Sequence, residues 1–245
     1  MKNLLILGAT SGISRAYIDL VCARFEKVVL VARSGEKLSQ LASHVSAISN
    51  AEVETVVADL ADSDKHADLV SEVVARVGSI DLALISYGVL TDQSRCAEDA
   101  SYAMTQFNLN GTSTISLSLH LAKQMEQQGS GTLAVIGSVA GDRGRRSNYC
   151  YGAAKSAVES FLAGLRSDMQ KHNVHVLTIK PGFIDTPMTR DIKKGALWVG
   201  ADKAASDIDS AIQKKKNILY TPWFWRYIML IIKSIPEFIF KKLPL

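Results

Sequence analysis

A glycine-rich turn at residues 8–14, Gly-Ala-Thr-Ser-Gly-Ile-Ser, constrains the fold of this chain more than any other feature. Before it, residues 2–7 form a short apolar run that is typical of a buried parallel strand. After it, residues 11–24 repeat apolar side chains at helical spacing. A strand, a tight turn and a helix in this order form the first half of a β-α-β unit, so the sequence predicts an α/β fold.

The same alternation of short apolar runs and amphipathic segments continues to residue 180. It predicts further strands at 27–32, 52–58, 81–86, 132–137 and 175–180, and further helices at 35–46, 66–77, 100–127 and 151–171. Because β-α-β crossovers are right-handed, these elements predict a doubly wound parallel sheet of the Rossmann type. With 245 residues and a hydrophobic fraction of 47%, the chain can bury such a sheet in a single domain.

The charge of the chain is small overall but uneven. A net charge of +4 argues against nucleic acid as a partner, although residues 213–245 hold seven Lys or Arg and only one acid. Cys22, Cys96 and Cys150 have no CxxC spacing, so we expect reduced thiols rather than a disulfide framework or a metal site. Met1 leads directly into the first strand, and we therefore expect a cytoplasmic protein without a secretory signal.

The glycine-rich turn has the composition of a dinucleotide site. Gly8 and Gly12 lack Cβ atoms, so phosphate can approach the backbone at the N-terminus of the following helix. Sites for NAD place an acid about 20 residues after the glycines, where it binds the ribose 2′-hydroxyl. Here Arg33 stands at the end of the second predicted strand and can pair with a 2′-phosphate. The sequence therefore predicts NADPH rather than NADH; the alternative is that Arg33 is a solvated strand-end residue.

Three side chains can perform acid–base chemistry. Tyr151 and Lys155 are one turn apart on a predicted helix and share a face, and Ser138 ends the preceding strand. An ammonium at about 5 Å stabilises a phenolate by roughly 3 kcal/mol at an effective dielectric constant of ~20, so we expect Lys155 to lower the pKa of Tyr151. Such a tyrosine can donate a proton to a carbonyl oxygen that the serine orients. Each residue alone also has a structural explanation, as a packing tyrosine or a solvated lysine.

The order of a larger set of residues resembles the short-chain dehydrogenase/reductase family over residues 3–190. The set is Gly8, Gly12, Asp59, Gly88, Asn108, Ser138, Tyr151, Lys155, Pro181 and Gly182. The resemblance implies reduction of a carbonyl to an alcohol with NADP(H), without a metal, and with Tyr151 as the proton donor. It gives catalytic roles to Ser138, Tyr151 and Lys155, and it makes Asn108 the residue that kinks a helix and holds a relay water.

The resemblance also implies an extended nucleotide site. Asp59 and Leu60 are expected beside the adenine ring, and the backbone of Ile184 and the hydroxyl of Thr186 at the nicotinamide end. The full set expected to bind the cofactor is Gly8, Thr10, Ser11, Gly12, Ile13, Arg33, Asp59, Leu60, Gly88, Tyr151, Lys155, Pro181, Gly182, Ile184 and Thr186. Two departures stand out: Ser14 replaces the third glycine, and Ile-Ser-Tyr at 85–87 replaces Asn-Asn-Ala. We expect a slight shift at Ser14 and altered support of the sheet at 85–87.

Two segments bear on the substrate. The loop 141–149, between Ser138 and Tyr151, contains three arginines that can bind an anionic group. Residues 218–245 interleave aromatic, aliphatic and basic side chains, which is typical of an interfacial amphipathic helix. Both features resemble polysaccharide-pathway reductases of the decaprenylphosphoryl-2-keto-ribose reductase type. That resemblance implies a keto-sugar on a polyprenyl phosphate, reduced at the inner face of the membrane.

Several alternatives are left open by the sequence. The arginine loop can instead be solvated, and the C-terminal segment can instead pack on a partner subunit of a homodimer or homotetramer. The substrate can be an unrelated soluble ketone. A non-enzymatic NADPH sensor would be favoured by loss of Tyr151 or Lys155, and both are present. A long-chain epimerase is disfavoured because it would need a sizeable C-terminal substrate domain.

The expected organisation has two parts. Residues 1–212 are predicted to form the NADP-binding catalytic domain, with a substrate lid at about 188–212. Residues 213–245 are predicted to form a basic, aromatic and irregular C-terminal segment.

Overall fold

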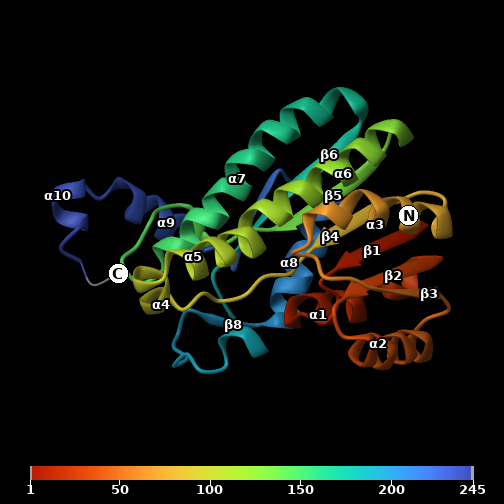
Figure 1. Ribbon diagram of the computed structural model, residues 1–245, viewed down its shortest axis with the longest axis horizontal. Coiled ribbons are helices and arrows are strands. Elements are labelled where there is room, and N and C mark those ends of the chain that lie inside the picture. The colour runs from red at the N-terminus through yellow and green to blue at the C-terminus, as the bar shows by residue number, and fades with distance from the viewer. Residues whose placement is uncertain (1, 244–245) are drawn as a thin grey trace.

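A seven-stranded parallel sheet forms the centre of the computed structural model, which describes residues 2–243 (Figure 1). The strand order is β3-β2-β1-β4-β5-β6-β9, and every neighbouring pair is parallel. The strands are β1 Asn3–Leu7, β2 Lys27–Ala32, β3 Glu52–Val57, β4 Leu82–Ile85, β5 Gly131–Ile136, β6 Val174–Pro181 and β9 Ile218–Thr221. A separate ribbon pairs β7 Phe183–Asp185 with β8 Trp198–Gly200. The sheet confirms the predicted doubly wound α/β fold.

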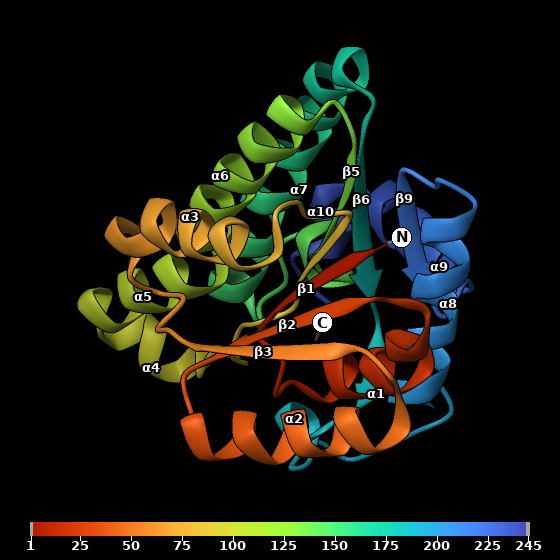
Figure 2. The ribbon, with the colours of Figure 1, turned by 90° about the vertical axis from the view of Figure 1, so that its right-hand side faces the viewer.

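Helices cover both faces of this sheet (Figure 2). They are α1 Gly12–Val21, α2 Gly35–Ile48, α3 His66–Val77, α4 Gln93–Glu98, α5 Ala100–Phe107, α6 Ser113–Gln128, α7 Tyr149–Met169, α8 Ala201–Gln213, α9 Trp225–Ser234 and α10 Glu237–Phe240. Helices α1, α2 and α8 pack on one face, and α3, α6 and α7 on the other. Successive residues of β1 point into opposite cores: Leu4 and Ile6 into the first, Leu5 and Leu7 into the second. Burial on both faces explains why the strands are continuously apolar.

The strand order places the carboxyl ends of several strands around one crevice. The chain runs outward from β1 to β2 and β3, then returns to place β4 on the other side of β1. A parallel sheet with such a reversal leaves a crevice at the carboxyl edge, where ligands bind. The predicted functional residues follow the ends of β1 to β6, so the topology gathers them there.

Two regions differ from the elements expected from sequence. The long helix at 100–127 is interrupted by a π-helical turn, Asn108–Thr112, between α5 and α6. Two asparagines and a glycine lie in this turn, and asparagine side chains compete with helical hydrogen bonds. The residues after 217, expected to be irregular apart from an amphipathic helix, form the helices α9 and α10 and also the edge strand β9, which was not expected. The strand is only four residues long and half exposed, so its apolar pattern is weak.

The C-terminal helices are tied to the loop after β5. Arg143 of that loop donates to the carbonyl oxygens of Ile232 at 2.6 Å and Ile235 at 2.7 Å. Its guanidinium also pairs with Glu237 at 2.8 Å and lies 3.6 Å from the centre of the Phe240 ring. No helix within residues 2–243 is long and apolar enough to cross a bilayer.

Candidate active site

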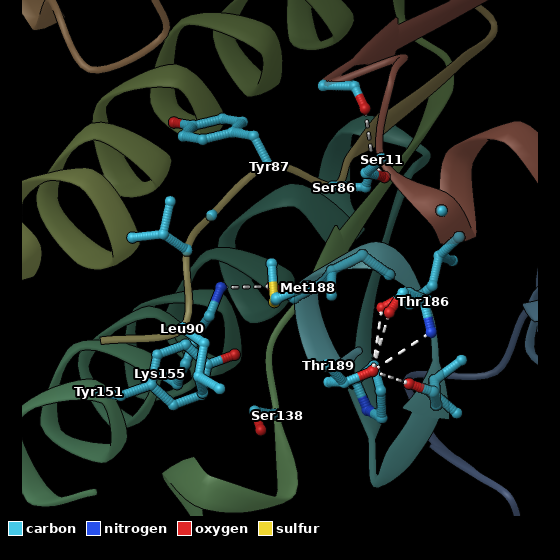
Figure 3. Close-up of a pocket in the computed structure, with 18 of the residues that line it drawn as sticks. Ser11, Ser86, Tyr87, Leu90, Ser138, Tyr151, Lys155, Thr186, Met188 and Thr189 are labelled. Carbon is cyan, nitrogen blue, oxygen red and sulfur yellow. Dashed lines mark hydrogen bonds between the residues drawn. The ribbon is translucent and has the colours of Figure 1, made fainter. Parts of the chain in front are cut away.

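A cavity of about 340 Å³ lies at the carboxyl edge of the sheet (Figure 3). Every residue predicted to bind the cofactor lines it: Gly8, Thr10, Ser11, Gly12, Ile13, Arg33, Asp59, Leu60, Gly88, Tyr151, Lys155, Pro181, Gly182, Ile184 and Thr186. Ser138 lines it too. Figure 3 shows Tyr151, Lys155 and Ser138 on one side of this space and Thr186 and Thr189 on the other. The predicted nucleotide residues therefore share one wall with Ser138, Tyr151 and Lys155.

The turn between β1 and α1 requires glycine at two positions. Gly8 has a φ of +85°, and a Cβ there would lie 2.8 Å from the Cβ of Tyr87. A Cβ on Gly12 would lie 2.9 Å from the Cβ of Thr186. Ser11 caps α1 with its hydroxyl. The helix thus begins at the cavity wall with unpaired backbone N–H groups nearby, an arrangement that binds phosphate.

The two departures from the family pattern meet in space. Ser14, which replaces the third glycine, is fully buried, and its hydroxyl hydrogen-bonds that of Ser86. Ser86, which replaces an asparagine, also lies 3.1 Å from the Ser11 hydroxyl. An unpaired buried hydroxyl costs about 1–3 kcal/mol, so each serine stabilises the other. Tyr87, expected to disturb the sheet, instead packs against the core and hydrogen-bonds Ser113 at 2.9 Å.

Arg33 and Asp59 follow β2 and β3 on the cavity wall. Arg33 is exposed, and within the part of the chain that the structure describes no side chain pairs with its guanidinium. Asp59 accepts the N–H of Ala61 at 3.1 Å. A free guanidinium at the end of β2, with no carboxylate there, suits a 2′-phosphate better than a 2′-hydroxyl.

Helix α7 carries Tyr151 and Lys155 into the cavity from the same face. Lys155 is only 2% exposed. Its ammonium lies 5.8 Å from the centre of the Tyr151 ring and donates to the carbonyl of Ile136 at 3.1 Å. Ser138 follows β5, and its hydroxyl accepts the N–H of Ala140 at 3.1 Å. The three predicted catalytic groups therefore come from two adjacent elements, which fix their relative positions.

Burial controls the protonation of this pair, and the expectation that Lys155 lowers the pKa of Tyr151 was wrong. Burial raises the pKa of Tyr151 to about 12, against the opposing effect of a hydrogen bond with Ser138. Burial lowers the pKa of Lys155 to about 8, opposed by the charge of Glu159. Because Lys155 loses its proton at a lower pH than Tyr151, the ammonium is gone before the phenol ionises on raising the pH, but at neutral pH it remains beside the phenol. At neutral pH the tyrosine is a phenol, which is the form that donates a proton.

Two asparagines of the π-helical turn have different surroundings. Asn108, the predicted relay residue, does not line the cavity; its side-chain amide donates to the carbonyl of Ala61 at 3.1 Å. Asn110 is fully buried and accepts the N–H of Val89 at 2.9 Å. A Cβ on Gly88 would lie 2.8 Å from the Asn110 side-chain oxygen and 3.8 Å from the Lys155 ammonium. Asn110 therefore supports the cavity wall beside Lys155. The sequence analysis did not identify Asn110; the one feature of the sequence that could have indicated it is its position two residues after Asn108.

The three arginines of the 141–149 loop do different things. Arg143 is occupied by the C-terminal helices, and Arg146 is exposed and does not line the cavity. Arg145 lines the cavity, and burial lowers its pKa. The Nε atom of Arg145 and the side-chain oxygen of Asn148, also on the wall, are buried without a hydrogen-bond partner within residues 2–243. Of the three arginines, only Arg145 therefore lines the cavity.

The segment after β6 completes the cavity with residues that the sequence did not single out. Met188, Thr189 and Ile192 line it, and Thr186 and Thr189 form a capping box around the turn. Phe183 lines it as well; its ring stacks on Trp198 and meets Trp225 edge to face, with centroids 5.1 Å apart in both pairs. In the sequence, this segment was marked by the Pro181-Gly182 motif, by Ile184 and Thr186, and by the lid expected at about 188–212.

Known proteins resemble this chain in both sequence and structure. The model of the short chain dehydrogenase family matches residues 2–197. An uncharacterised oxidoreductase of Mycobacterium tuberculosis is 33% identical over 217 residues, covering 89% of this chain and 87% of the relative. Another uncharacterised oxidoreductase, from Streptomyces coelicolor, is 30% identical over 243 residues, covering 99% and 96%. A short-chain dehydrogenase from Sphingobium yanoikuyae in complex with NADPH has the same fold, with a TM-score of 0.82 at 23% identity over 97% of each chain.

Proposed function

This chain belongs to the short-chain dehydrogenase/reductase family, and from that premise we propose that it reduces a carbonyl to an alcohol with NADPH. Family membership makes it an oxidoreductase that uses a nicotinamide cofactor. The observation that carries the proposal is the single cavity wall shared by Ser138, Tyr151, Lys155 and the glycine turn.

The residues of the chain divide the work of the reaction. A bound nicotinamide supplies the hydride for the carbonyl carbon. Tyr151, held as a phenol, donates its proton to the carbonyl oxygen, and the Ser138 hydroxyl orients that oxygen. Lys155 is placed to hold the ribose and to keep a positive charge beside the phenol as its proton leaves. Asn108 is proposed to hold a relay water through the kinked backbone of the π-helical turn.

NADPH is favoured over NADH by the end of β2. Arg33 is free to pair with a 2′-phosphate, and the N-terminus of α1 offers N–H groups to the pyrophosphate. Asp59 and Leu60 complete the proposed adenosine end. The short-chain dehydrogenase from Sphingobium yanoikuyae, which has the same fold, was solved in complex with NADPH, and this is consistent with the proposed preference.

The substrate is proposed to carry an anionic, oxygen-rich group. Arg145 and Asn148 line the cavity that holds Tyr151, and Nε of Arg145 and the side-chain oxygen of Asn148 are buried without a hydrogen-bond partner in the described chain. Leaving one such group unpaired costs about 1–3 kcal/mol, which a phosphate and a hydroxyl of the substrate would offset. A keto-sugar on a polyprenyl phosphate has both groups, and it also has a lipid that the C-terminal helices could meet.

The outer face of α9 and α10 favours contact with an anionic lipid surface. Its exposed large apolar side chains are Trp223, Tyr227, Leu230, Ile231, Phe238 and Ile239. Between them lie Arg226 and Lys233, for which the structure of residues 2–243 shows no acidic partner. Interfacial aromatic residues with interspersed cations suit the headgroup region of a membrane. We propose that this face places a cytoplasmic enzyme at the inner surface of the membrane.

The boundaries of lid and tail are also proposals. Helix α8 buries Ala204 and Ile208 beneath the sheet, so it is a fixed base for the lid predicted at 188–212. The movable part is proposed to be residues 188–197, which include Met188 and Ile192 of the cavity wall. Because β9 belongs to the central sheet, the tail outside the catalytic domain is proposed to begin after it.

A screen of NADPH oxidation by the purified protein tests the function. The carbonyl compounds are a keto-sugar on a short polyprenyl phosphate, the same keto-sugar phosphate without lipid, and cyclohexanone, with Tyr151→Phe as the control. The lipid-linked compound should be reduced fastest. If only cyclohexanone reacts, the soluble ketone reductase is the better description. If NADPH binds and no carbonyl is consumed, the protein is a sensor.

A further inference from the structure

A cluster of buried charges lies behind the catalytic wall, and the mechanism above does not use it. The side chains of Asp142, Glu159 and Lys180 are only 2%, 8% and 11% exposed. None of the three lines the cavity, so none is placed to touch a cofactor or substrate. Burying charged groups is costly unless they are paired and well placed, so the cluster calls for a physical reason.

Glu159 is connected to the catalytic serine through the main chain. Its Oε1 atom accepts the backbone N–H of Ser138 at 2.9 Å. The turn around Ser138 is shaped to admit this carboxylate: a Cβ on Gly137 would lie 2.6 Å from Oε1. A Cβ on Gly141 would lie 2.8 Å from the Glu159 Cδ atom. Because residues 137 and 141 are both glycine, the backbone on either side of Ser138 can approach the Glu159 carboxylate closely.

Lys180 of β6 holds the other oxygen of Glu159. Its ammonium lies 2.7 Å from Oε2 of Glu159 and 2.5 Å from Asp142. Tyr220 of β9 donates to the second oxygen of Asp142 at 2.9 Å. Burial alone would lower the pKa of Lys180, but the two carboxylates outweigh burial and raise it. Lys180 therefore stays an ammonium and fixes the orientation of the Glu159 carboxylate.

We propose that Glu159, clamped by Lys180 and Asp142, is a positioning residue that fixes the main chain of Ser138 in its catalytic place. Glu159 lies on α7 two turns after Tyr151, so one helix carries both the proton donor and the anchor of the serine that works with it. The anchor keeps the distance between the two groups constant when the loop after Ser138 moves around a substrate. This inference rests on the reductase function proposed above.

The first test needs no substrate. In 15N-labelled protein, the amide proton of Ser138 should resonate downfield, because its acceptor is a carboxylate. Glu159→Gln should move it upfield, and the matched control Glu98→Gln, which removes an exposed carboxylate on α4, should leave it unchanged. An unchanged Ser138 signal in Glu159→Gln would overturn the proposal whether or not the protein is a reductase.

The second test is a double-mutant cycle on the ketone reduced fastest in the screen above. Glu159→Gln should lower kcat about tenfold while KM for NADPH stays within about twofold. In a Ser138→Ala background the same change should lower kcat by less than about twofold, because the positioned group is gone. Equal losses in both backgrounds would mean that Glu159 acts independently of Ser138.

A pH profile adds a readout that a purely structural role would not move. The charged and titratable groups that face Glu159 are Tyr151 and Lys155 on its own helix, Lys180 of β6, Tyr220 of β9 and Asp142 of the loop. The carboxylate opposes the lowering of the Lys155 pKa, so Glu159→Gln should shift the alkaline loss of activity to lower pH. If Glu159→Gln fails to fold, the change of Glu159→Gln, Asp142→Asn and Lys180→Met, which removes all three charges of the cluster, replaces it in the first two experiments. An unshifted profile in Glu159→Gln would mean that residue 159 carries no charge in the parent, which counts against a carboxylate clamped by Lys180.

Discussion

At the scale of single residues, burial rather than mutual attraction sets the charges of the proposed catalytic pair. Tyr151 and Lys155 are one helical turn apart, yet burial raises the pKa of the first to about 12 and lowers that of the second to about 8. The phenol therefore keeps its proton over the whole neutral range, and Lys155 is the group that titrates first. At neutral pH the pair therefore offers a phenolic proton and a neighbouring positive charge.

The pH dependence follows from Lys155. The ammonium is present below a pH of about 8 and lost above it, so kcat/KM for reduction should be level below that pH. Above it, the rate should fall by up to about tenfold per pH unit. Steady-state kinetics from about pH 6 to about pH 10, which covers ~2 pH units on either side of the Lys155 pKa, would measure this fall in rate. In Lys155→Arg, which keeps its charge, the remaining activity should not fall near pH 8; a fall there would assign the titration to another group.

Tyr151→Phe should abolish reduction while leaving NADPH binding within about twofold, because only the proton donor is removed. Lys155→Ala should weaken both binding and turnover, since its ammonium is also placed to hold the ribose. Fluorescence titration with NADPH and single-turnover kinetics separate the two effects. A Tyr151→Phe enzyme that keeps more than about a tenth of the parent kcat would exclude Tyr151 as the acid.

Arg33→Asp should weaken NADPH binding by roughly 2 kcal/mol, or about thirtyfold in Kd, because a carboxylate would face the 2′-phosphate. NADH binding should change much less. Calorimetric titration of both nucleotides against parent and variant measures the difference. Equal affinity of the unmodified protein for both nucleotides would contradict the proposed role of Arg33.

Residue types at the site were predictable, while their partners were not. The spacing of Tyr151, Lys155 and Ser138 follows from local chain geometry, which the sequence displays directly. The pairing of Ser14 with Ser86 joins residues 72 positions apart, and each looked like an isolated departure until both were seen together. Likewise, only the packed structure shows that Arg145, and not Arg143, faces the cavity.

At the scale of elements, the turn after β6 and the helix α9 are fitted to each other. A Cβ on Gly182 would overlap the indole ring of Trp225, which is 3% exposed beneath the cavity wall. The missing side chain at 182 is therefore a requirement of helix packing as well as of the cofactor turn. Long, periodic elements such as α7 were predictable, and the amphipathic pattern indicated a helix in the C-terminal segment. The strand β9 and the position of α9 were not predictable, because they depend on contacts with distant segments such as Arg143.

Gly182→Ala should destabilise the fold by about 1–3 kcal/mol, because the added methyl overpacks the contact with Trp225. The same change at Gly164, which is exposed on α7 with open space around it, should stabilise the protein by about 0.5–1 kcal/mol. Urea denaturation of the two variants gives the comparison. In a Trp225→Phe background the penalty of Gly182→Ala should shrink; a constant penalty would place the strain elsewhere.

At the scale of the whole molecule, the C-terminal segment has one face in the protein and one in solvent. Trp225, Met229 and Phe240 are buried, while Trp223, Leu230 and Ile231 are each more than 60% exposed. Because β9 is part of the sheet, deleting residues 218–245 would damage the fold as well as the outer face. Point changes on the exposed face are the cleaner test of what that face contacts.

Changing Trp223, Leu230 and Ile231 to serine should release the protein from anionic phosphatidylglycerol vesicles without lowering its stability. Flotation of parent and variant measures binding, and phosphatidylcholine vesicles and high salt should each weaken it. The rival explanation, a subunit contact in a homodimer or homotetramer, predicts instead that the variant elutes later in size-exclusion chromatography. A parent that never floats, with a variant that loses its oligomer, would decide for the subunit contact.

The bond between Arg143 and the carbonyl oxygens of Ile232 and Ile235 also limits how this protein can be recombined. The loop that leads to the proposed catalytic tyrosine and the last helices of the chain share one side chain, so neither is a free-standing module. A chimera that takes its C-terminus from a relative should lose order in the loop unless residue 143 and its acceptors are exchanged as a unit. Substrate range and the proposed membrane contact would then change together, because both segments depend on residue 143.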